Sequence, residues 1–267
     1  MILPKLTAIG SGKGGTGKTL VATALASALA EQGERVLLCD ADLGLANATV
    51  HLGLESGGDL VGFLADRLSL DQAVVPVLGG AGTAGGFDLV SAPAGSGSLA
   101  DVDRGVAERL IDKLRLSCAY DRVLLDLSAG VDATTMGFAA RSDETLLVLT
   151  SDPAALTDAY AFVKLLLRQG KGGRRPLTLV NMVENEIEAA RTRDTLAKTC
   201  RAFLKTAPDY LGFVPRDHHV LVAVRQQRPL VAAFPDSPSS RALRDVARRL
   251  GDNAVCQPNS DDALRLR

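Results

Sequence analysis

One glycine-rich segment constrains the fold of this chain more than any other. Residues 12–19 read Gly-Lys-Gly-Gly-Thr-Gly-Lys-Thr and fit the pattern G-x-x-x-x-G-K-[ST]. They follow a short strand pattern and precede a long helical pattern, which is the context that this motif requires. Glycines let backbone N–H groups surround phosphate oxygens, and the following helix points its positive end at them. The segment therefore predicts a nucleotide phosphate site inside an α/β fold.

Each position of this loop has an expected role. The backbone expected to surround the phosphates is that of Gly12, Gly14, Gly15, Thr16 and Gly17. Lys18 is expected to neutralise the β- and γ-phosphates, and the Thr19 hydroxyl is expected to ligate Mg²⁺.

Short apolar runs alternate with longer amphipathic runs along the rest of the chain. The expected strands are Leu6–Ser11, Arg35–Asp40, Phe87–Ala92, Arg122–Leu127, Thr145–Ser151, Leu177–Val183 and Tyr210–Val214. The expected helices are Lys18–Gln32, Val102–Leu116, Pro153–Gln169, Glu186–Thr206 and Ser239–Leu250. This alternation predicts a doubly wound, mostly parallel sheet flanked by helices. We expect one P-loop domain over residues 1–251 and a polar tail over residues 252–267.

Composition excludes several classes of protein. Apolar residues make up 46% of the 267 residues, which excludes a disordered chain. No apolar stretch approaches the roughly 20 residues needed to span a bilayer, and the N-terminus runs directly into a strand rather than a signal peptide. The net charge of −1 disfavours bulk electrostatic binding to nucleic acid. The four cysteines show no C-x-x-C pair, which favours a reduced, cytoplasmic protein and leaves open only a cluster shared between subunits.

Three carboxylates stand at the ends of predicted strands. Asp40 and Asp42 follow the second strand, and Asp126 ends an apolar run. Such strand ends face the ligand crevice of an open α/β sheet. Asp126 is expected to hold the Mg²⁺ shell. The spacing alone does not separate the roles of Asp40 and Asp42, and either could cap a turn.

Lys13 is a second lysine within the loop, and it makes residues 13–19 resemble the deviant Walker A sequence K-G-G-x-G-K-[ST] of the MinD/ParA ATPases. The resemblance implies that Lys13 reaches across a dimer interface to the partner's phosphates, in the manner of an arginine finger. It also implies that Asp40 lies near Mg²⁺ through water and that Asp42 orients or deprotonates the attacking water. Lys13, Lys18 and Asp42 are therefore the expected catalytic residues, and Thr19, Asp40 and Asp126 the expected metal residues.

The same resemblance extends to the second switch and to the base. Residues 128–130, Ser-Ala-Gly, resemble the family's second switch. Asn181 matches the family asparagine that contacts adenine, and Pro215 and Asp217 lie in the loop that closes over the base. A strand-end amide and an ordinary turn are the alternative reading. No N-K-x-D guanine motif is present, which favours ATP and ADP as the nucleotides.

Residues 42–48, 180–183 and 210–215 resemble the flagellar and division branch of this family, which includes FlhG, FleN and MinD. FlhG proteins limit the number and placement of flagella. The resemblance implies a chain that forms an ATP-dependent homodimer and works with a protein partner of a flagellar or polar system. The alternatives are a MinD-like division-site ATPase, a metabolic or electron-transfer relative, and a ParA-like partitioning protein. Nonspecific DNA binding by a ParA-like protein could use four arginines of the last helix, Arg241, Arg244, Arg248 and Arg249.

Membrane binding is not expected without a partner. Many relatives end in a basic amphipathic helix that binds membrane. Here the apolar residues of the last expected helix, Leu243, Val246, Ala247 and Leu250, form a narrow stripe that indicates core packing. The following tail is polar, with Leu264 and Leu266 as the large apolar residues near its end.

Overall fold

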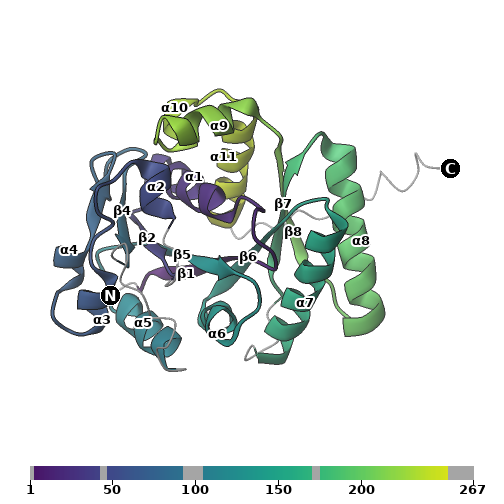
Figure 1. The fold of residues 1–267 in the computed structure, drawn as a ribbon, viewed down its shortest axis with the longest axis horizontal. Coiled ribbons are helices and arrows are strands. Elements are labelled where there is room, and N and C mark those ends of the chain that lie inside the picture. The colour runs from purple at the N-terminus through teal and green to yellow at the C-terminus, as the bar shows by residue number, and fades with distance from the viewer. Residues whose placement is uncertain (1–2, 43–46, 93–104, 170–174, 252–267) are drawn as a thin grey trace.

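The computed structural model describes residues 3–42, 47–92, 105–169 and 175–251. Within these ranges an eight-stranded sheet has the order β3-β4-β2-β5-β1-β6-β7-β8 (Figure 1). The strands are β1 Lys5–Ser11, β2 Val36–Asp40, β3 Val75–Val77, β4 Phe87–Ser91, β5 Arg122–Ala129, β6 Glu144–Leu149, β7 Leu177–Val183 and β8 Asp209–Pro215. Neighbouring strands pair in parallel except β3 with β4. The predicted doubly wound, mostly parallel sheet is therefore confirmed.

Helices cover both faces of the sheet (Figure 1). They are α1 Lys18–Glu31, α2 Ala48–Leu52, α3 Leu60–Leu64, α4 Leu70–Ala73, α5 Val106–Arg115, α6 Ala133–Arg141, α7 Pro153–Gln169, α8 Glu186–Leu204, α9 His218–Arg225, α10 Leu230–Ala233 and α11 Pro238–Gly251. Alternating residues of one strand serve opposite faces. In β5, Val123 and Leu125 pack with α5 and α6, whereas Leu124 packs with α1 and α11. An apolar layer therefore lies between the sheet and the helices on each face. Helix α1, which follows the glycine-rich loop, packs into one of these layers.

The expected elements agree with the observed ones to within a few residues, except where they are short. The sequence analysis did not identify β3 or the helices α2, α3, α4, α6, α9 and α10. The start of the helix expected at 102 lies outside the described residues, as does the tail expected at 252–267. No helix in the described parts of the chain is long and apolar enough to cross a membrane.

Helix α11 packs its apolar stripe into the core, as predicted, because Leu243, Val246, Ala247 and Leu250 are each at most 2% exposed. Three of the arginines of α11 form ion pairs or hydrogen bonds within the chain. Arg244 pairs with Glu31, Arg248 pairs with Asp245, and Arg249 donates to the Leu211 carbonyl oxygen. The basic surface considered for DNA is therefore smaller than the sequence suggests.

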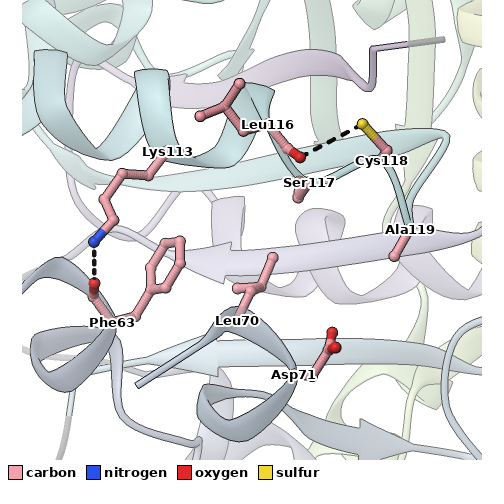
Figure 2. A pocket seen from close by; sticks show the side chains of 8 residues that line it. All are labelled: Phe63, Leu70, Asp71, Lys113, Leu116, Ser117, Cys118 and Ala119. Atoms are coloured by element: carbon pink, nitrogen blue, oxygen red, sulfur yellow. Dashed lines mark hydrogen bonds between the residues drawn. The ribbon is translucent and has the colours of Figure 1, made fainter. Parts of the chain in front are cut away.

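A pocket of about 390 Å³ lies between α3, α4 and the segment that follows α5 (Figure 2). Phe63 and Leu116 line it, and Lys113 donates to the Phe63 carbonyl oxygen at its edge. The segment 116–119 leads into β5, so the pocket lies at the amino end of the strands. The glycine-rich loop follows the carboxyl end of β1, at the opposite edge. None of the predicted site residues lines this pocket.

Candidate functional site

The glycine-rich loop is held between β1, β5 and α7. The Gly130 N–H donates to the Ser11 carbonyl oxygen at 2.9 Å, and the Ser11 hydroxyl donates to the Lys13 carbonyl oxygen at 2.9 Å. Gly12 lies so close to α7 that a Cβ there would stand 2.4 Å from the Asp158 backbone. Only a glycine fits at this position without moving the helix, so the first glycine of the motif is fixed by packing.

The loop ends at the amino terminus of α1, which has no side-chain cap. Gly17 is the N-cap residue, with φ 82°, and it offers no side chain to accept from the first N–H groups of the helix. Helices α6, α8 and α9 instead begin with Asp132, Asn185 and Asp217, whose side chains accept from their first turns. The N–H groups of α1 are thus left for a ligand anion, in the manner of helix termini that bind phosphate.

Two further features of the loop fit phosphate oxygens. The Thr16 hydroxyl is buried without a hydrogen-bond partner within the described residues. A Cβ on Gly14 or Gly15 would have nothing described within 4 Å, so the loop has open space on its outer side. A buried hydroxyl without a partner is costly, and a phosphate oxygen of a bound nucleotide would supply one.

Lys18, Asp40 and Asp126 converge beneath the loop. Asp40 is the last residue of β2, and its register partner Asp126 lies in the carboxyl half of the adjacent strand β5. The Lys18 Nζ lies 2.8 Å from Asp126 Oδ1, and both side chains are buried. Asp40 accepts from the N–H groups of Asp42 at 3.1 Å and Ala48 at 3.0 Å. The structure therefore brings together residues that the sequence placed on three different elements.

The carboxylates of this cluster resist ionisation. Burial, followed by the charge of Asp126, raises the pKa of Asp40 to about 7, despite the two backbone hydrogen bonds that oppose the rise. Burial also raises the pKa of Asp126, although Lys18 and the Thr19 hydroxyl both stabilise its charged form. The charge of Asp42 raises both pKa values further. The cluster therefore holds more negative charge than Lys18 alone can balance, which fits the binding of a cation.

The donor set also fits Mg²⁺ in its chemistry. The Thr19 hydroxyl and the carboxylates of Asp40 and Asp126 are oxygen donors, which is the ligand type that Mg²⁺ takes. Mg²⁺ dehydrates reluctantly and keeps several waters, so few protein ligands suffice. The residues predicted for the metal and those predicted for the phosphates lie at one edge of the sheet, where both could be met by one Mg²⁺–nucleotide complex.

Lys13 does not join this cluster. Its Nζ lies 2.9 Å from Asp152 Oδ2, and the two side chains are 42% and 49% exposed. Asp152 stands directly before α7, and its Oδ1 accepts from the Ala154 N–H at 2.8 Å. The hydrogen bond from the Lys13 ammonium group lowers the pKa of Asp152. The ammonium group is thus held at the surface of its own chain by an ion pair that water can reach.

The Asn181 side chain contacts the backbone of the glycine-rich loop. The Asn181 Nδ2 donates to the Thr16 carbonyl oxygen at 2.8 Å, and Asn181 is 2% exposed. The next residue, Met182, has φ 60° at a break in the β7–β8 register. A non-glycine residue in this region is strained, and such strain often accompanies functional sites. The Asn181 side chain lies against Gly17. A Cβ added to Gly17 would lie 2.5 Å from Asn181 Nδ2.

Pro215 and Asp217 lie at the end of β8, at the same carboxyl edge. The Pro215 carbonyl oxygen accepts from the Ser239 hydroxyl at 2.9 Å. Asp217 caps α9 and also accepts from the Ser239 N–H at 3.1 Å. This loop is therefore fastened to α11, and the Asp217 side chain has a structural role in capping α9.

Three residues of this region were not predicted from the sequence. Asp152 holds Lys13, Asp158 sets the space above Gly12, and Ser239 fastens the β8–α9 loop. No motif marks them, because their contacts join residues far apart in the chain. The strand-to-helix position of Asp152 was the available signal, since acidic residues at helix starts are common caps.

Known proteins resemble this chain over most of its length. The family model of the CobQ/CobB/MinD/ParA nucleotide binding domain matches residues 7–230. Antiactivator FleN of Pseudomonas aeruginosa is 37% identical over 247 residues, covering 92% of this chain and 86% of FleN. Flagellum site-determining protein YlxH of Helicobacter pylori is 29% identical over 245 residues, covering 91% of this chain and 80% of YlxH.

A solved structure has the same architecture. The septum site-determining protein MinD of Pyrococcus horikoshii, complexed with Mg-ADP, superimposes with a TM-score of 0.76 at 25% identity. The match covers 94% of this chain and 98% of that one. The fold described above is thus similar to that of a protein solved with Mg-ADP.

Proposed function

The chain belongs to the CobQ/CobB/MinD/ParA nucleotide-binding family, and from that premise we propose that it is a Mg²⁺-dependent ATP hydrolase that alternates between a monomer and an ATP-bound dimer. The cycle controls the number or placement of a cellular structure, namely flagella, from the cytoplasm. The similarity to antiactivator FleN and to a flagellum site-determining protein supports flagella as the cellular structure that is controlled.

In this proposal the loop and α1 bind the triphosphate. The backbone from Gly12 to Gly17 and the Thr16 hydroxyl contact phosphate oxygens, and Lys18 leaves Asp126 to neutralise them. Asn181, Pro215 and Asp217 surround the base.

Thr19, Asp40 and Asp126 hold the metal shell in the same proposal. When bound, Mg²⁺ supplies charge neutralisation at the β- and γ-phosphates. Asp42 orients or deprotonates the attacking water.

The state of Lys13 is the observation that carries the proposal. Its ammonium group lies at the surface, bonded only to the half-exposed Asp152 among the interactions described for it. Exposed ion pairs contribute little free energy, so Lys13 can leave Asp152 at small cost. A lysine placed in the loop yet directed away from its own phosphate site supports action on a second chain. Its release from Asp152 and its contact with the partner's phosphates are then the event that couples dimer formation to hydrolysis.

Two lysine variants test this proposal. Lys18→Ala should abolish ATP binding, because the triphosphate then lacks its buried cation. Lys13→Ala should bind ATP as the wild type does while losing both turnover and dimer formation. Calorimetric ATP titration, steady-state ATPase assays and light scattering measure the three properties. Equal affinity and equal turnover in wild type and Lys13→Ala would refute the assignment.

The proposed partners are a second copy of the chain and a protein of a flagellar or polar system, and we propose no membrane binding without such a partner. A MinD-like role at the division site shares the same chemistry and differs in the partner. A ParA-like role requires DNA binding with a strong salt dependence. The engagement of Arg244 with Glu31 and of Arg249 with the Leu211 carbonyl oxygen disfavours that role. DNA binding therefore stays a less favoured alternative.

A further inference from the structure

Two of the three histidines of this chain stand side by side at the start of α9. His218 and His219 directly follow Asp217, the last residue before the helix. Each of these three residues offers a ligand atom, and the three atoms lie within 4.8 Å of one another. The third histidine, His51, lies on α2 and is not part of the group.

The carboxylate of Asp217 is fixed in place. Its side chain is 2% exposed, and it accepts from the N–H groups of His219 at 3.0 Å and Ser239 at 3.1 Å. Burial by itself would raise the pKa of Asp217, but hydrogen bonds from Ser239, His219 and Ser237 outweigh it and lower the pKa to about 2. Asp217 is therefore a carboxylate at every pH at which the protein would be handled.

The two imidazole rings are also arranged for ligation. The His219 Nδ1 lies 2.8 Å from Asp217 Oδ1, and the His218 Nδ1 lies 3.9 Å from the same oxygen. The centroids of the two rings are 3.9 Å apart, and the Phe234 ring lies 4.8 Å from the His219 ring. His219 is thus held on two sides, whereas the His218 side chain is 78% exposed and open to solvent.

Two imidazole nitrogens and one carboxylate oxygen form a donor set for a borderline divalent ion. Zn²⁺ accepts nitrogen and carboxylate ligands and completes its shell with water. Mg²⁺ prefers oxygen donors alone, so it would not compete for this group. We propose that Asp217, His218 and His219 bind a divalent transition-metal ion of the Zn²⁺ class. The site is distinct from the oxygen-donor cluster of Asp40 and Asp126, and its chemistry does not depend on the proposed function.

An ion at this position would act on the loop between β8 and α9. Asp217 and the Pro215 carbonyl oxygen are both bonded to Ser239 of α11. A metal bond to Asp217 and to the first turn of α9 therefore stiffens the connection between β8, α9 and α11. The proposed base-contacting loop and the metal group share Asp217, so an ion there would also alter the affinity for nucleotide, with equal effect in the reverse direction.

Cobalt binding tests the proposal directly. Co²⁺ is titrated into untagged, metal-stripped, nucleotide-free protein in excess Mg²⁺, which saturates the oxygen-donor cluster. We expect one equivalent to bind with visible ligand-field absorption and without the near-ultraviolet charge-transfer band of thiolate ligation. The same titration with Zn²⁺ in a calorimeter should give the same stoichiometry. A thiolate band, or no binding with millimolar metal, would overturn the proposal.

Single substitutions locate the ion. His218→Gln and His219→Gln should each weaken Zn²⁺ binding at least about 10-fold, and Asp217→Asn, which retains an oxygen for capping α9, about 10- to 100-fold. His51→Gln is the matched control and should bind as the wild type does. Because His218 is exposed, its replacement leaves the fold intact, which unfolding curves verify. Unchanged affinity in His218→Gln and His219→Gln, or a loss confined to His51→Gln, would overturn the site.

Discussion

The buried carboxylate of Asp40 should make the stability of the nucleotide-free protein depend on pH. Burial and the charge of Asp126 raise the pKa of Asp40 from 3.8 to about 7. Between these values the folded protein retains a proton that the unfolded chain has released. The contribution of Asp40 to the free energy of unfolding is therefore greatest below about pH 4 and falls as the pH rises to about 7.

Asp40→Asn should remove this dependence, because an amide does not titrate. A rise of the pKa from 3.8 to about 7 corresponds to about 4 kcal/mol once Asp40 is fully ionised. From about pH 5 to about pH 8, the free energy of unfolding of the wild type should fall by about 2–3 kcal/mol relative to the variant. Asn has one acceptor oxygen where Asp40 uses two, which costs about 1 kcal/mol at every pH and leaves the slope unchanged.

Urea unfolding followed by circular dichroism measures this difference, in chelator and without nucleotide. Asp112→Asn, on the exposed side of α5, is the matched control and should follow the wild type. Added Mg²⁺ should restore the stability of the wild type at high pH more than that of Asp40→Asn. If the wild type and Asp40→Asn change in parallel between about pH 5 and about pH 8, Asp40 does not carry the raised pKa and the electrostatic account of the cluster is wrong.

Three further outcomes follow from the site and the tail. Lys18→Ala should lower the free energy of unfolding by about 3–5 kcal/mol at neutral pH, since it leaves Asp126 buried without its cation; an unfolding curve unchanged from the wild type would contradict the buried pair. Asp152→Asn keeps an oxygen to cap α7 but removes the charge that holds Lys13, so light scattering with ATP should show more dimer, and less dimer would count against this role. The purified protein should not sediment with anionic liposomes with ADP or ATP; ATP-dependent sedimentation that disappears when residues 252–267 are deleted would overturn this expectation.

Much of the fold could be predicted because its signals are local. The long helices carry a repeating apolar pattern, and the inner strands are apolar throughout because both faces are covered. The four- and five-residue helices α2, α3, α4 and α10 are too short to show any period. Strand β3 has only three residues, one of them Pro76, and its antiparallel pairing with β4 at the sheet edge leaves no distinctive pattern.

The candidate site likewise contains residues that local sequence signals mark and contacts that no local signal marks. Asp40, Asp126 and Lys18 could be identified because a strand end or a loop motif marks each of them. Their proximity follows from parallel pairing, in which adjacent strands present their carboxyl ends together. The contact of Lys13 with Asp152 joins residues 139 apart in the chain, and no periodic pattern reports such a distance. The residues of the proposed metal site, Asp217, His218 and His219, are adjacent in the sequence, but their ring orientations depend on packing against distant residues such as Phe234.

In the proposed function ATP, and not ADP, joins two copies of this chain. The most direct measurement is light scattering on the size-excluded Asp42→Ala variant, in which ATP is expected to stay bound and unhydrolysed. At micromolar protein we expect a dimer with Mg·ATP and a monomer with ADP or without nucleotide. The double variant Lys13→Ala, Asp42→Ala should remain monomeric with ATP. A monomer of Asp42→Ala in saturating Mg·ATP, with ATP demonstrably bound, would show that ATP does not drive dimer formation.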